Sequence, residues 1–72
     1  MNRLPLLSGR TILKVLAKVG YLEVRQRGSH IRLWCAGKKS ITVPDHKAIG
    51  RGLLKKILRD AELSVEDFVK LL

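Results

Sequence analysis

The fold of this chain is decided by residues 21–44, which read YLEVRQRGSHIRLWCAGKKSITVP. In this stretch, apolar and polar side chains alternate in three short runs, and a glycine separates each run from the next. Alternation with a period of two is typical of strands with one buried face, and glycines between such strands predict tight turns. The sequence therefore predicts three consecutive strands that pair as an antiparallel meander.

The alternation also assigns side chains to the two faces of this predicted sheet. In the first strand we expect Leu22 and Val24 to point into the core. A turn at Arg27 and Gly28 follows, and the third strand ends at Pro44. The opposite, solvent-exposed face is then expected to carry Tyr21, Glu23, Arg25, His30, Arg32, Trp34, Ser40 and Thr42.

Helices are predicted on both sides of the strands. Ser8 is placed to cap a helix over residues 9–19, in which apolar side chains recur every three or four positions. The same spacing predicts a second helix at residues 53–61, and Ser64 is placed to cap a short last helix at residues 65–72. The order helix, three strands, helix, helix predicts an α+β fold, with a three-stranded antiparallel sheet and the helices on one of its faces.

The length of the chain limits what it can hold. We expect residues 1–72 to form a single domain, because a domain of this size buries only about 60% of the surface of its unfolded chain. A deep substrate cavity does not fit such a core. The predicted sheet is also short, so the sequence favours a shallow binding surface suited to an extended polymer.

The charge of the chain is strongly positive and unevenly distributed. Fifteen Lys and Arg stand against six Asp and Glu, giving +9, and residues 1–59 hold fourteen of the basic and two of the acidic groups. Such a cation attracts polyanions, and counterion release from phosphates provides affinity for nucleic acid. Solubility of a small domain would explain the lysines equally well, so charge alone indicates nucleic acid without deciding for it.

Several classes of protein are not favoured. Cys35 has no partner for an internal disulfide, the N-terminus has no secretory signal pattern, and no apolar run reaches the roughly 20 residues of a membrane span, so we expect a cytoplasmic protein. His30 and His46 with one cysteine do not form a zinc site, and the sequence has no glycine-rich phosphate loop and no nucleophile elbow. We expect no metal and no cofactor.

The residues best suited to chemistry are Gln26-Arg27-Gly28-Ser29-His30, where an imidazole follows a tight turn and lies between two arginines. The segment RQRGSHIRL follows GYLEV and precedes ITVPDHK and LLKKILRDAELSVEDF. In these segments the chain resembles the HicA family of mRNA interferase toxins, and the resemblance covers nearly its whole length. Its most specific part is Gly28-Ser29-His30 combined with Val43-Pro44 and His46.

This resemblance implies a fold like that of double-stranded-RNA-binding domains, ribosome-independent cleavage of mRNA, and neutralisation by a HicB-type antitoxin. It also implies that His30 is the catalytic residue. Leu53 and Glu62 depart from the family pattern, which often has Thr and Gly at these positions. The first departure is expected to weaken the cap of the second helix, and the second to alter the turn before the last helix.

Imidazole chemistry agrees with this implication. RNA is cleaved without a metal when a base takes the proton of a 2′-hydroxyl, which then attacks its own phosphate, and imidazole titrates near neutral pH. We expect His30 to accept this proton or to donate one to the leaving oxygen, with Arg27 and Arg32 stabilising the phosphate charge. RNA-binding residues are expected to be Arg25, Arg27, Gly28, Ser29, Arg32 and Lys47.

Two further residues have competing interpretations. His46 is a candidate partner of His30 in acid–base chemistry, although a loop histidine beside proline is more often structural. Trp34 either stacks on a base or on the antitoxin, or only covers the sheet. The whole chain has an alternative too: a non-catalytic module that binds double-stranded RNA by shape, or a protein whose basic face docks an acidic partner. In the toxin interpretation, we expect any oligomer to form through the antitoxin complex.

Overall fold

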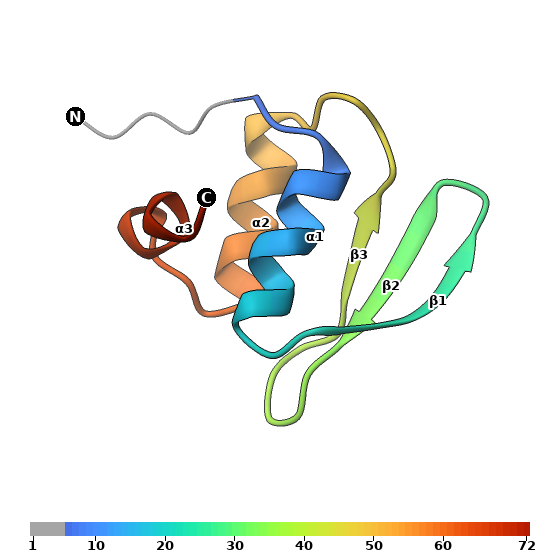
Figure 1. The fold of residues 1–72 in the computed structure, drawn as a ribbon, viewed down its shortest axis with the longest axis horizontal. Coiled ribbons are helices and arrows are strands. Elements are labelled where there is room, and N and C mark those ends of the chain that lie inside the picture. The colour runs from blue at the N-terminus through green and yellow to red at the C-terminus, as the bar shows by residue number, and fades with distance from the viewer. Residues whose placement is uncertain (1–5) are drawn as a thin grey trace.

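The computed structural model describes residues 6–72 and confirms the predicted α+β fold (Figure 1). Along the chain, one helix precedes the three strands and two helices follow them. The strands form an antiparallel sheet in the order β1-β2-β3. The elements are α1 (Gly9–Lys18), β1 (Leu22–Arg27), β2 (His30–Trp34), β3 (Ile41–Pro44), α2 (Arg51–Asp60) and α3 (Val65–Leu71).

The predicted caps explain where two of the helices begin. Ser8 Oγ accepts a hydrogen bond from the Thr11 amide at 3.1 Å, and Ser64 Oγ accepts one from the Asp67 amide at 3.0 Å. The start of α2 has no side-chain cap, since Gly50 precedes it, and the helix begins two residues earlier than predicted. Between α2 and α3 the backbone turns at Glu62, whose φ of 60° is in the left-handed region that favours glycine.

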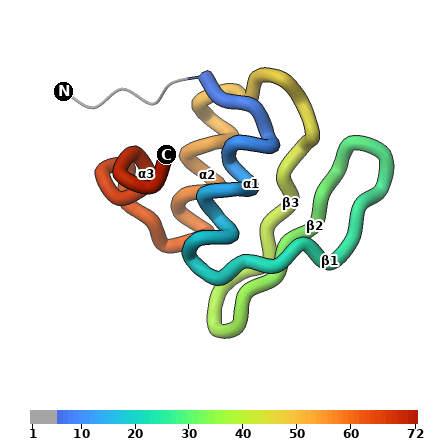
Figure 2. The backbone as a smooth tube through the Cα atoms, viewed as in Figure 1, coloured from blue at the N-terminus to red at the C-terminus, as the bar shows by residue number. Residues whose placement is uncertain are grey.

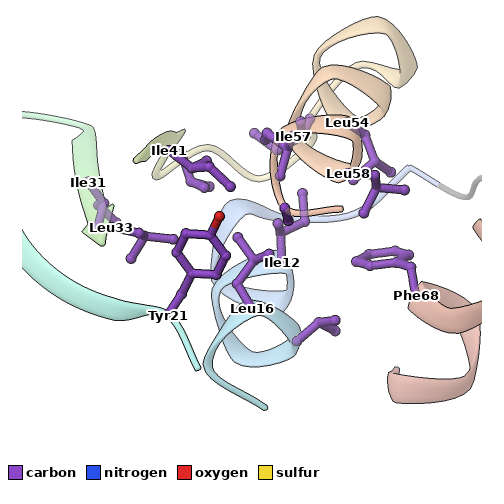
Figure 3. Close-up of a cluster of buried hydrophobic side chains, with 14 residues drawn as sticks. Ile12, Leu16, Tyr21, Ile31, Leu33, Ile41, Leu54, Ile57, Leu58 and Phe68 are labelled. Carbon is purple, nitrogen blue, oxygen red and sulfur yellow. The ribbon is translucent and has the colours of Figure 1, made fainter. Parts of the chain in front are cut away.

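The core lies between the helices and the facing side of β2 and β3 (Figure 3). Within residues 6–72, every buried side chain of the core is apolar or aromatic. Phe68 brings α3 against this core, and Tyr21 enters it from the segment before β1. The Tyr21 hydroxyl donates a hydrogen bond to the Lys39 carbonyl oxygen at 2.8 Å, which satisfies its one polar group.

The predicted faces of the first strand are wrong at its beginning. Tyr21 is buried, whereas Leu22 and Val24 are 60% and 56% exposed. An irregularity between Glu23 and Arg25 leaves Val24 as an extra residue in β1, as in a β-bulge. Simple alternation cannot show such an extra residue. Because of it, the residues before Val24 lie on the faces opposite to those predicted, whereas Arg25 lies on the predicted face.

The structure places the side chains around this irregularity as follows. Leu22 pairs with Trp34 and Arg25 pairs with Arg32, so these residues share the face that points away from the helices. Glu23 pairs with the core residue Leu33 and therefore lies on the opposite face, contrary to the prediction. All of β1 is nevertheless exposed, because the β1–β2 hairpin extends beyond the helices (Figure 1).

Candidate functional site

His30 occupies the first position of the middle strand, where all three strands meet. It pairs with Arg27 of β1 and with Pro44 of β3, and its side chain is exposed on the face away from the helices, as predicted. The turn before it consists of Gly28 and Ser29, one residue later than predicted, because Arg27 belongs to β1. Gly28 has a φ of 54°, which a two-residue hairpin turn with glycine in first position requires.

An open groove of about 640 Å³ surrounds this histidine on the exposed face of the sheet. We call it the sheet groove. Three arginines reach it from neighbouring positions, because Arg25 pairs with Arg32 across the strands and Arg27 pairs with His30. Its lining residues are Val24, Arg25, Arg27, His30, Arg32 and Thr42.

The electrostatics of the sheet groove favour an anion. Three guanidinium groups line it and no carboxylate does, so its own residues leave the positive charge uncompensated. Arg32 is held in place because its Nη1 donates a hydrogen bond to Thr42 Oγ1 at 2.9 Å. Guanidinium groups at fixed positions bind phosphate oxygens in bidentate geometry, so this groove is suited to a phosphodiester.

A second groove, of about 320 Å³, lies between β3 and α2. We call it the helix groove. It shares His30, Arg32 and Thr42 with the sheet groove, so the histidine stands where the two meet. Its lining residues are His30, Arg32, Ser40, Ile41, Thr42, Pro44, Leu53, Lys56, Ile57 and Asp60.

The loop after β3 is fastened to both the hairpin turn and the start of α1. The Asp45 amide donates to the Ser29 carbonyl oxygen at 2.6 Å, and the Gly9 amide donates to the His46 carbonyl oxygen at 2.9 Å. Arg10 donates from Nε and Nη2 to the two oxygens of Asp45, at 3.1 and 2.9 Å. This hydrogen-bonded pair raises the pKa of Arg10. Figure 2 shows this loop passing beside the beginning of α1.

The structure therefore gathers part of the predicted site and separates the rest. Arg25, Arg27, Arg32 and His30 line one groove, and Gly28 and Ser29 form the turn that leads into it. His46, Lys47 and Trp34 are exposed but line neither groove.

The α2 side of the site was not predicted from the sequence. Lys56 and Asp60 reach the helix groove from a helix that follows His30 by more than twenty residues. Their spacing of four residues on one helix indicates an ion pair, but no local pattern indicates that this pair faces β3. Only the packing of α2 beside the last strand brings it near His30.

Two other features of the described chain bear on function. Among residues 6–72, no three His, Cys, Asp or Glu side chains are grouped so that they could hold a metal ion. No helix within the same residues is long and apolar enough to cross a membrane.

Fold and groove together define a small α+β protein whose exposed sheet face carries an imidazole among arginines. The family model of the HicA toxin of bacterial toxin–antitoxin systems matches residues 9–63, from the first residue of α1 to beyond the end of α2. The chain therefore belongs to the HicA toxin family. None of the curated proteins compared with the chain matches it.

Proposed function

We propose that this protein is the toxin of a HicA/HicB-type pair and cleaves mRNA as a metal-independent endoribonuclease, with His30 as its catalytic residue. The observation that carries this proposal is the sheet groove, in which three arginines and one exposed histidine surround a space open to a polymer. Membership of the HicA toxin family supports it further.

The proposed reaction uses the RNA's own 2′-hydroxyl as nucleophile. The imidazole of His30 takes the hydroxyl proton while the 2′-oxygen forms a bond to the adjacent phosphorus. The bond from phosphorus to the 5′-oxygen breaks, and the imidazolium returns the proton to that oxygen. The products are a 2′,3′-cyclic phosphate and a 5′-hydroxyl, and the proton taken from the 2′-hydroxyl ends on the 5′-oxygen.

The arginines would act on charge rather than on protons. As the 2′-oxygen attacks, negative charge accumulates on the non-bridging phosphate oxygens. We expect this charge to be stabilised in the transition state by Arg32, which is hydrogen-bonded to Thr42, and by Arg27, which pairs with His30. Removing one such donor typically lowers kcat by about 100- to 1,000-fold.

The decisive experiment compares the wild type with His30→Ala and His46→Ala on a purified long RNA, with a chelator present. We expect the wild type and His46→Ala to cleave and His30→Ala to leave the RNA intact. A substrate with a single 2′-deoxy sugar at the cleavage site should bind without being cut. Circular dichroism verifies that each variant is folded.

The same experiment separates the proposal from its alternative. If the folded wild type binds double-stranded RNA and cuts no RNA, the protein is a binding module. If His30→Ala cuts as fast as the wild type, the histidine is not catalytic.

An antitoxin partner follows from the same proposal. A HicB-type protein with an acidic surface would complement the charge of the basic sheet groove and block access to His30. It would bind the toxin in the cytoplasm before the toxin reaches mRNA. The product of a neighbouring gene, purified and added in equimolar amount, should abolish cleavage and form a complex on gel filtration. A stable complex that leaves cleavage unchanged would contradict this mode of inhibition.

A further inference from the structure

The helix groove continues the sheet groove past His30 on the opposite side. His30, Arg32 and Thr42 line both, so an RNA strand with its scissile phosphate at His30 has neighbouring nucleotides on either side of this boundary. The sheet groove accounts for one side only. On the other side, the RNA strand would continue into the helix groove.

The helix groove is lined by both apolar and charged side chains. Its apolar lining comes from Ile41, Leu53 and Ile57, of which Leu53 is 37% exposed and the other two are buried. Lys56 provides an ammonium group on a side chain that is 61% exposed. Apolar surface fits the flat face of a base, and an exposed ammonium fits a phosphate oxygen.

Lys56 is held in position by its neighbour on α2. Its Nζ lies 3.0 Å from Asp60 Oδ2, and the Asp60 side chain is only 10% exposed. Asp60 therefore fixes the ammonium group at the rim of the groove, while the exposed side of that group stays open to a ligand. Hydrogen bonding from Lys56 is also the main cause that lowers the pKa of Asp60, so the carboxylate stays charged.

We propose that the helix groove is a second nucleotide subsite, which holds the nucleotide next to the scissile phosphate with its base against Leu53 and its phosphate on Lys56. This inference rests on the proposed function, since it extends the same cleavage site. A volume of about 320 Å³ is at the lower end of ligand pockets, which suits one nucleotide. A base that occupies this groove cannot be stacked in a double helix. The proposed subsite therefore requires an RNA that is single-stranded at the cleavage site.

The test uses a matched pair of lysines. Lys55→Ala and Lys56→Ala each remove one positive charge from neighbouring positions of α2, so long-range attraction to RNA falls equally in both. Lys56 lines the helix groove, whereas Lys55 is exposed and lines neither groove. We expect Lys56→Ala to raise KM for a single-stranded oligonucleotide about tenfold, as for loss of one charge-assisted hydrogen bond, and Lys55→Ala to change it less than about twofold.

A double variant guards against an indirect effect. Lys56→Ala leaves Asp60 with only its longer ion pair to Arg59, at 3.9 Å, and the less compensated carboxylate would itself repel RNA. In Lys56→Ala with Asp60→Asn both charges are absent, and the proposal expects KM to stay raised about tenfold. If the double variant regains the KM of the wild type, or if the two lysine variants behave alike, the subsite assignment is overturned.

Binding measured without turnover distinguishes this inference from the proposed function. Fluorescence anisotropy of a single-stranded oligonucleotide in which every 2′-hydroxyl is absent gives Kd for each variant, whether or not the wild type cleaves RNA. Absence of cleavage together with a Kd contrast between the two lysine variants would refute the enzyme and retain the subsite. Cleavage without that contrast would refute the subsite alone.

Discussion

Gly9→Ala tests whether the beginning of α1 is packed against the end of β3 as closely as the structure shows. A Cβ at this position would overlap the Pro44 carbonyl oxygen and lie 3.1 Å from the Pro44 carbonyl carbon. Both neighbours are backbone atoms, so no side chain can rotate away. The helix would have to retreat from the strand and break the 2.9 Å hydrogen bond from the Gly9 amide to the His46 carbonyl oxygen.

The expected cost follows from these two effects. Overpacking against a fixed backbone costs about 1–3 kcal/mol, and a lost, partly buried hydrogen bond costs about 1–3 kcal/mol. Alanine recovers at most about 1 kcal/mol through its higher helix propensity. We therefore expect the free energy of unfolding to fall by roughly 1–5 kcal/mol, which lowers Tm by roughly 4–40 °C in a domain of this size.

The assay is urea unfolding followed by circular dichroism, with Gly52→Ala as the matched control. Gly52 is in the first turn of α2 and nothing lies within 4 Å of a Cβ built there, so the same substitution should raise stability by about 0.4–1 kcal/mol. The opposite signs of the two variants are the prediction. If Gly9→Ala is as stable as the wild type, the close approach of α1 to Pro44 does not exist in solution.

Four further outcomes follow from single residues. Glu62→Gly should raise the free energy of unfolding by about 1 kcal/mol, because the φ of 60° costs a side chain energy that glycine avoids; an unchanged urea midpoint would contradict it. The single tryptophan, Trp34, is 48% exposed on the same face as the sheet groove but outside it, so single-stranded RNA that extends along β2 past the groove should quench its fluorescence; unchanged emission at saturation would show that the RNA does not reach this end of β2. The pKa of Asp60 is lowered from 3.8, so its pairing stabilises the protein above about pH 4 and is lost as pH falls through the folded pKa; the stability difference between wild type and Asp60→Asn should shrink there. Burial raises the pKa of Tyr21, so tyrosinate absorbance should develop above pH 10.0 in the folded protein and at a lower pH in urea, and coincident titrations would refute its burial.

The sequence was sufficient for the element order and for most of the arginine-rich site. Period-two alternation placed His30 and Arg32 on the exposed face, because β2 is regular and its apolar side chains fill the core. Ser8 and Ser64 marked their helices because capping depends on local backbone geometry. These features depend on neighbours a few residues apart.

Two features at and just before the start of β1 could not be predicted from alternation. Tyr21 enters the core because the end of α1 and the strand meet there, although Leu22 is the more apolar side chain beside it. The extra residue Val24 then restores Arg25 to the exposed face. A bulge is set by the pairing of two strands, and the sequence of one strand does not contain that information.

By itself, then, the sequence determined the α+β class, the hairpin turn before His30 and the arginines on either side of it in the chain, since short-range periodicity and turn chemistry govern all three. Tertiary structure alone decided which distant groups accompany the histidine. In the folded chain, the loop at Asp45 is hydrogen-bonded to Ser29, and His46 lies outside both grooves. Lys56 of α2 lines the helix groove together with His30. The reason is that the positions of these groups relative to His30 depend on how α2 packs against the edge of the sheet. The shape of the whole core determines that packing.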